Sequence, residues 1–263
     1  MTIHSIPWAA GAETPAVRRI TTADLDWALA QGWKDFIAKR GDVVLIALIY
    51  PFIGFAAAAA SLNERALLPM FFPLVAGLSI LGPALASGFY EIARRRDAGL
   101  DASWRHFFDP LGRRGRWSLR TLTLALGVLF ALWLAAAWAV YATTLGRAPI
   151  TGLADFVSRL FTTPEGWTMI IVGNLMGAAF AAVTLVFSLV SFPMAVDKAA
   201  DPFTAVETSV RAVQANLGAT IAWGARIAVL LLVGCLPAFV GLAVVLPVLG
   251  YATWHLYTRL VER

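Results

Sequence analysis

Long apolar runs alternate with short polar segments along this chain, and their lengths predict a bundle of membrane-spanning helices. A helix needs about 20 apolar residues to cross a hydrocarbon core of about 30 Å. The last run, residues 219–257, is about twice that length, so we expect it to fold back at Gly234, Pro237 and Gly241. The pattern therefore predicts an all-α integral membrane protein with six spans, at about residues 43–62, 66–90, 121–145, 168–192, 219–236 and 238–257.

Three further segments have apolar residues at helical spacing on one face only, and we expect them to lie in the membrane interface. They cover about residues 22–40, 152–161 and 202–216. Thr21 with Asp24, Thr163 and Asp201 are expected to cap helices. Residues 1–20 have no sustained period and predict a flexible tail ahead of a membrane domain covering residues 21–263.

The first and third of these segments align at an offset of 177 residues, pairing residues 25–41 with 202–218. Two interpretations stay open. The alignment indicates either an internal repeat of the kind found in transporters, or the ordinary pattern of any amphipathic helix that precedes a span.

Basic residues are distributed unevenly between the apolar runs. The segment from Glu91 to Arg120 holds eight arginines, and positive charge keeps such a loop on the cytoplasmic side. With six spans, 18 of the 21 lysines and arginines fall on that side, and Arg65, Arg147 and Arg159 fall on the other. We therefore expect both termini in the cytoplasm.

Composition narrows the function classes. The chain is 59% hydrophobic and 14% charged, against about 25% charged in soluble domains. The net charge of +5 follows the topology, so we expect no nucleic acid partner. Cys235 is the single cysteine, and His4, His106 and His255 do not share a span, so we expect no disulfide, metal or haem cofactor. Nucleotide-binding and hydrolase motifs do not occur in the sequence, and we expect no enzyme.

Three stretches carry a family resemblance. They are Ala28–Phe36 (ALAQGWKDF), Leu81–Arg94 (LGPALASGFYEIAR) and Leu246–Tyr257 (LPVLGYATWHLY). Over roughly residues 20–260 the chain resembles a bacterial integral-membrane family known as domain of unknown function 2189. Tyr251 stands where the resemblance leads us to expect a histidine. The resemblance implies a multi-span inner-membrane protein and supplies no activity.

Polar and small residues inside the predicted spans are the candidates for packing or function. Gly173, Gly177 and Ala181 form a ridge that would let another helix approach closely. Asn174 is expected to hydrogen-bond across helices. Arg226 would either reach the cytoplasmic headgroups or form an ion pair with Glu91.

The arginine loop is the main candidate for contact with other molecules. Its candidate contact residues are Arg94, Arg95, Arg96, Arg113, Arg114 and Arg116. Basic residues attract anionic lipid headgroups, at about 1 kcal/mol each near the surface. We expect a non-catalytic structural or accessory membrane protein that meets lipids, a membrane-protein partner or a second copy of itself. The alternative is a channel or transporter for a small solute.

Overall fold

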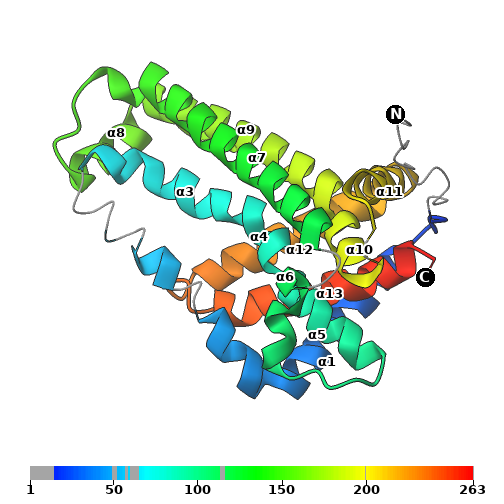
Figure 1. Ribbon diagram of the computed structural model, residues 1–263. Coiled ribbons are helices and arrows are strands. Elements are labelled where there is room, and N and C mark those ends of the chain that lie inside the picture. Colours follow the sequence, from blue (N-terminus) through cyan, green and yellow to red (C-terminus); the bar gives the residue numbers. More distant parts are fainter. Residues whose placement is uncertain are drawn as a thin grey trace, which may run out of the picture.

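The computed structural model describes residues 15–48, 52–56, 59, 65–112, 116–198 and 200–262, and these form an assembly of helices (Figure 1). The predicted all-α class is confirmed. Within those ranges, β-pairing is limited to the isolated antiparallel bridge between Val17 and Val261.

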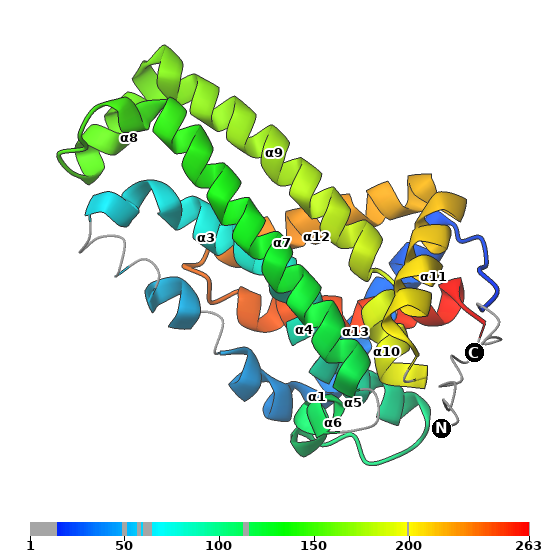
Figure 2. The ribbon, with the colours of Figure 1, turned by 45° about the horizontal axis from the view of Figure 1, so that its top comes forward.

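Two long helices, α7 (Arg116–Thr143) and α9 (Pro164–Ser188), run side by side through the molecule (Figures 1 and 2). After α9 the chain continues as α10 (Ser191–Lys198), α11 (Pro202–Ala215) and α12 (Leu217–Cys235). In the described part of the chain, four segments are long and apolar enough to cross a membrane: Leu68–Asp97, Trp117–Thr143, Pro164–Lys198 and Leu217–Cys235. They correspond to the predicted spans two to five.

The predicted first and sixth spans have a different outcome. Of residues 43–62, positions 49–51, 57, 58 and 60–62 lie outside the described residues, and 43–47 form the last part of α1 (Thr22–Ala47), so a continuous first span is not tested. Residues 238–257 fall mainly within α13 (Leu242–Leu260), which is helical but is not one of the four apolar candidates. The predicted fold-back is confirmed, because α12 ends at Cys235 and the turn to α13 places Ala238 and Phe239 at positive φ.

Helix α13 forms the centre of a buried core with α1 (Thr22–Ala47). Gly32 of α1 faces α13 so closely that a Cβ there would lie 2.6 Å from the carbonyl oxygen of Val248. Leu25, Ala28 and Phe36 of α1 are buried. These residues belong to the face that the sequence analysis assigned to the interface, and here protein covers them.

Helix α1 begins with the predicted cap. The Asp24 carboxylate accepts hydrogen bonds from the backbone N–H and the hydroxyl of Thr21, each at 2.9 Å. The helix then runs without a break to Ala47, whereas Asn216 separates α11 from α12 at the corresponding point of the aligned segment. The two aligned segments therefore differ in their helical continuity.

The first and last described residues meet beside the end of α13. Arg18 donates its backbone N–H to the carbonyl of Leu260 at 2.8 Å, and Glu262 donates its own to Ala16 at 3.1 Å. Asn216 accepts the backbone N–H of Ile20 at 2.8 Å. Residues 16–20 of the predicted flexible tail are thus held in place, and residues 1–14 lie outside the described residues.

The first of the four apolar segments is irregular. It passes through η1 (Arg65–Met70), α3 (Phe71–Gly77), η2 (Leu78–Leu81), α4 (Gly82–Leu85) and α5 (Ser87–Asp97). Proline lacks the N–H that an α-helix interior needs, and prolines occupy positions 69, 73 and 83. Trp133 of α7 donates its indole N–H to the Pro73 carbonyl at 2.7 Å, which ties the segment to α7. Beyond α4 the chain turns away into α5 (Figure 1).

The two ends of the α7–α9 pair differ in their surroundings (Figures 1 and 2). One end holds η4 (Leu145–Arg147) and α8 (Leu153–Thr162), and we call it the α8 end. The other end holds α5, η3 (Trp104–Phe108), α6 (Asp109–Gly112), α10, α11 and the C-terminus. We call it the arginine-rich end. The predicted helices at 152–161 and 202–216 are present as α8 and α11. As expected, the side chain of Thr163 caps the start of α9 and that of Asp201 caps the start of α11.

Candidate functional site

A carboxylate lies buried among the arginines at the arginine-rich end. Glu91 is only 1% exposed, and Arg94 donates to both of its carboxylate oxygens at 2.8 Å. Arg95 lies 3.6 Å from the same carboxylate. A buried charge needs such compensation, because an unpaired carboxylate loses its hydration without replacement.

Arg95 links this pair to the loop that follows α5. It donates to the carbonyl of Asp101 at 2.5 Å and lies 3.4 Å from the Asp109 carboxylate. His106 lies between Asp101 and Asp109, with nitrogen–oxygen distances of 3.1 and 2.8 Å. Its hydrogen bond, with a smaller contribution from Ser103, holds the pKa of Asp101 below the ordinary value. The loop is therefore fixed to α5 by charge-assisted contacts.

Three side chains near the end of α13 each bind an aspartate on a different helix, and we call this set the α13 clamp. His255 Nε2 lies 2.8 Å from Asp35 of α1. Trp254 donates to Asp97 of α5 at 2.8 Å, and Tyr257 donates to Asp197 of α10 at 3.0 Å. The α13 clamp joins four segments that are far apart in the sequence.

The contact at Asp35 extends to a cation and two further side chains. Arg96 lies 3.2 Å from the second oxygen of Asp35. Trp27 contacts the His255 ring edge-on, with centroids 5.7 Å apart, and Arg259 lies 4.1 Å above Trp27. This packing leaves both Asp35 and His255 almost fully buried.

The arginines predicted to contact lipid therefore have different positions. Arg94, Arg95 and Arg96 all bind carboxylates of the protein itself, and their side chains are 20%, 13% and 38% exposed. Arg113 and Arg114 lie outside the described residues, and Arg116 is described only as the first residue of α7. The structure gives Arg94 and Arg95 a role in holding α5 and its loop.

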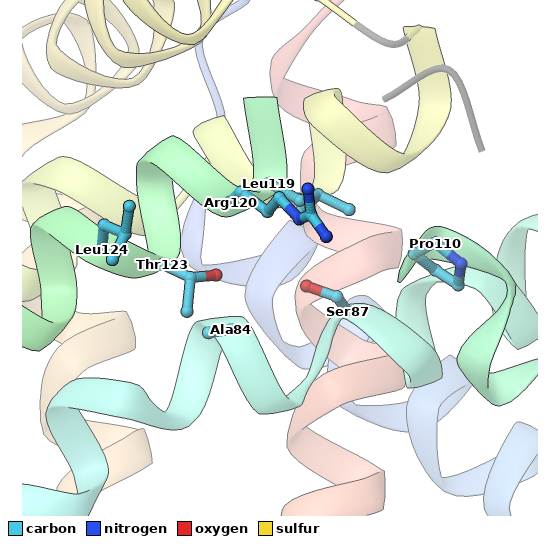
Figure 3. A pocket seen from close by; sticks show the side chains of 7 residues that line it. All are labelled: Ala84, Ser87, Pro110, Leu119, Arg120, Thr123 and Leu124. Carbon is cyan, nitrogen blue, oxygen red and sulfur yellow. The ribbon is translucent and has the colours of Figure 1, made fainter. Parts of the chain in front are cut away.

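A groove opens where α4 turns into α5 beside α7, with a cavity volume of about 380 Å³ (Figure 3). Ala84, Ser87 and Pro110 line one side of it. The other side consists of one face of α7, formed by Leu119, Arg120, Thr123 and Leu124. The lining is mainly apolar and contains no acidic residue.

Arg120 is the charged residue of this groove, and its guanidinium extends toward Ser87 (Figure 3). Unlike Arg94 and Arg95, it makes no hydrogen bond or ion pair with any residue in the described ranges. Its charge is left for solvent or for a bound group.

The predicted helix-packing ridge has little contact with other helices. A Cβ on Gly177 would lie 3.3 Å from the Trp133 ring, while Gly173 faces open space. Ala181 is exposed. The ridge therefore touches α7 through Gly177 and leaves its other two members uncovered by the described residues.

The two intramembrane polar candidates have partners other than those predicted. The Asn174 amide donates to the Ile170 carbonyl of its own helix at 2.7 Å, so the expected bond between helices is wrong within this chain. Arg226 pairs with Asp26 of α1 at 2.8 Å rather than with Glu91. Asn174 thus bonds within its own helix, whereas Arg226 joins α12 to α1.

These charged contacts hold helices and turns of the described chain to one another. Each aspartate of the α13 clamp lies on a different helix and binds a side chain of α13. Asp109 of α6 forms an ion pair with Arg95 of α5. Among the residues described, no group of three or more His, Cys, Asp or Glu side chains could hold a metal ion.

Sequence reasoning missed the α13 clamp and the groove for different reasons. Asp35 and His255 are 220 positions apart, and no spacing rule connects them. The sequence does mark Arg120, because it is the last arginine of the Glu91–Arg120 segment and directly precedes the predicted span at residues 121–145. It entered only the count of basic residues on each side of the membrane.

Comparison with known proteins bears on the same helices. Residues 71–197 match the family model described as "Predicted integral membrane protein (DUF2189)", which confirms the resemblance over that segment. No curated protein and no solved structure matches the chain. The matched segment includes α5, the arginine loop, α7, α9 and α10.

Proposed function

We propose that this chain, whose residues 71–197 match the model of the integral membrane proteins of domain of unknown function 2189, is a non-catalytic accessory protein of the bacterial inner membrane. Its arginine-rich end meets anionic lipid headgroups or a partner protein on the cytoplasmic side. Both termini lie on that side.

The separation of charge between the two ends of the α7–α9 pair carries this proposal. The α8 end holds Arg147 and Arg159, and Arg159 donates to backbone carbonyls of its own loop. The arginine-rich end holds the α5 arginines, Arg120 and the hydrogen-bonded segments 16–18 and 260–262. Basic residues collect on the cytoplasmic side of a membrane, so this asymmetry supports the orientation.

The polar groups near the apolar helices support an accessory role over transport. A transport path needs polar groups that face a shared cavity, and buried ionisable residues in membranes usually mark such a path. Here Asn174 binds its own helix and Arg226 binds Asp26 of α1. The α5 arginines and Arg120 lie together at one end, where headgroups and partner proteins are found.

The proposal is tested by purifying the full chain from its own membranes in a mild detergent. Mass spectrometry then measures the retained lipids and proteins. We expect enrichment of anionic phospholipid over the total membrane extract, or one protein in stoichiometric amount. Retained lipid with the bulk composition and no protein would contradict the proposal, as would solute flux into liposomes that contain this chain alone.

A further inference from the structure

The groove beside Arg120 has the chemistry of a phospholipid site. We propose that it binds one anionic glycerophospholipid, with the phosphate at the Arg120 guanidinium and one acyl chain along the exposed face of α7. This assignment rests on the proposed function, since it requires the arginine-rich end to lie at a lipid surface.

The groove forms where the segment that contains α4 and α5 bends away from α7. Pro83 lies in the first turn of α4, and the chain bends between Ala84 and Ser87 before α5 begins (Figure 3). The bend leaves a cavity of about 380 Å³ instead of a helix–helix contact. That volume is near the lower end of the roughly 300–1,000 Å³ typical of small-molecule sites.

The guanidinium of Arg120 has the geometry to bind a phosphate, and no described residue competes with the phosphate for it. An arginine can give two parallel hydrogen bonds to a phosphate, and these charge-assisted bonds are stronger than neutral ones. No described residue engages the Arg120 guanidinium, which extends across the groove toward Ser87 (Figure 3). The lining contributes no carboxylate that would repel an anion.

The depth of Arg120 matches the headgroup region. Trp117, one turn earlier on α7, is 72% exposed, and exposed tryptophans favour the membrane–water interface. Arg120 therefore lies only about 4–5 Å further along the helix. A phosphate bound there stays at the level where lipid phosphates already lie.

Apolar residues continue from the groove along the same face of α7. Leu124, Val128 and Leu132 follow Arg120 at intervals of four residues and are 71%, 61% and 56% exposed. Residues four apart share one face of a helix. One acyl chain can thus lie along this row while its headgroup stays at Arg120, an arrangement that a water-soluble phosphate compound would not use.

The charge around the groove favours an anionic lipid over a zwitterionic one. The groove lining holds the Arg120 cation and no carboxylate, so its charge repels the amine of a zwitterionic headgroup. Phosphatidylglycerol carries the phosphate without an amine. We therefore take it as the probe.

The test is a titration of the full-length protein with phosphatidylglycerol in a mild non-ionic detergent, followed by native mass spectrometry. We expect one phosphatidylglycerol to bind before all others, and phosphatidylcholine to bind at least several-fold more weakly. Arg120→Gln should raise the apparent Kd of that first lipid about tenfold, the scale set by a lost charge-assisted hydrogen bond. Arg105→Gln is the matched control, because it removes the charge of another exposed arginine, from η3 and outside the groove.

A second variant tests the cavity without changing charge. Ala84→Phe places a ring in the groove and should weaken the first lipid about as much as Arg120→Gln. Glycerol phosphate, which has the headgroup chemistry without the acyl chain, should not compete at a tenfold excess over the lipid. Competition by it would overturn the lipid assignment in favour of a soluble phosphate compound.

The remaining outcomes separate this assignment from the proposed function. If Arg120→Gln and Ala84→Phe bind the first lipid like the wild type, the groove assignment is wrong while the anionic preference of the whole protein stands. Equal losses in Arg120→Gln and Arg105→Gln would also overturn it. If the wild type has no preference for phosphatidylglycerol, the lipid part of the proposed function is contradicted together with the groove.

Discussion

The α1–α13 pair and the α7–α9 pair are both built from long helices, yet they bury their surfaces in different ways. In α13, side chains such as Tyr251, Trp254 and Leu260 are fully buried by other helices. In the segment containing α9, only 6% of the most apolar window is buried inside the protein. The first pair is covered by protein, and the second needs a bilayer to cover it.

The polar residues of the two pairs show the same difference. The α13 clamp places three aspartates against α13, where packed protein can hold their partners in a fixed geometry. On α9, Thr184 and Asn174 bond back to carbonyls of their own helix. A helix in hydrocarbon satisfies its polar groups internally, whereas a helix in a protein core can use them to join its neighbours.

The largest expected effect is from a charge placed on the uncovered pair. Leu175, near the middle of α9, is 68% exposed, and Leu175→Asp should cost about 3 kcal/mol of insertion free energy if lipid covers this position. Glycosylation mapping of the α9 segment measures this cost. Thr168→Asp, near the end of α9, is the control and should cost far less, because its carboxylate can reach the headgroups. Equal costs at the two positions would contradict the placement of α9 in the bilayer.

The second-largest expected effect comes from adding one methyl group to a glycine in each pair, which should change their stability differently. A Cβ on Gly32 would clash with backbone atoms of Val248 and Ala252 of α13, so Gly32→Ala should lower the free energy of unfolding by about 2–3 kcal/mol. Gly173→Ala, on α9, meets open space and should be neutral or stabilising by up to about 1 kcal/mol. Thermal unfolding in detergent compares them. Similar unfolding temperatures for the two variants would show that α1 does not pack tightly on α13.

The buried aspartate of the α13 clamp should have a somewhat smaller effect. Asp35→Leu leaves His255 and Arg96 without their carboxylate and should cost about 2 kcal/mol, a figure reduced because Arg96 is partly exposed. The control is Asp26→Leu, which breaks the exposed pair with Arg226 and should cost under about 1 kcal/mol. Unfolding in a denaturant series measures both. An equal cost would contradict the structural role of the α13 clamp.

The smallest expected effect is a pH dependence at the start of α1. Hydrogen bonds from the backbone and the hydroxyl of Thr21 lower the pKa of Asp24. A carboxyl group with a lowered folded pKa stabilises the fold above its unfolded pKa, near 4, and loses that contribution as the pH falls through the folded value. The wild type should therefore lose more stability than Asp24→Asn between about pH 5 and pH 3. Parallel loss in the two proteins would show that this cap does not contribute.

The contrast between the pairs also explains what the sequence could predict. The lengths of the apolar runs and the uneven distribution of basic residues predicted helices α7, α9 and α12. This was possible because a bilayer constrains the composition of such a helix and not its contacts with particular residues. The turn after α12 was predictable from Gly234, Pro237 and Gly241. The capping residues Thr163 and Asp201 were predictable from local chemistry.

What the sequence could not predict depends on contacts between distant segments. The apolar face of α1 looked like an interfacial helix, and only the position of Gly32 against α13 shows that protein covers it. Arg94 and Arg95 looked like free cations, and their partners are Glu91 and the loop around Asp109. A charge pattern gives the side of the membrane, but it does not give the partner of each charge.

The central claim is that α7 and α9 cross the membrane with the arginine-rich end in the cytoplasm. Cysteine accessibility in intact cells tests it most directly, in a Cys235→Ser background that removes the single native cysteine. Ser158→Cys on α8 should react with a membrane-impermeant maleimide added from outside, and Ala98→Cys after α5 should react only after permeabilisation. Labelling of Ala98→Cys in intact cells, or of both positions from the same side, would contradict the account.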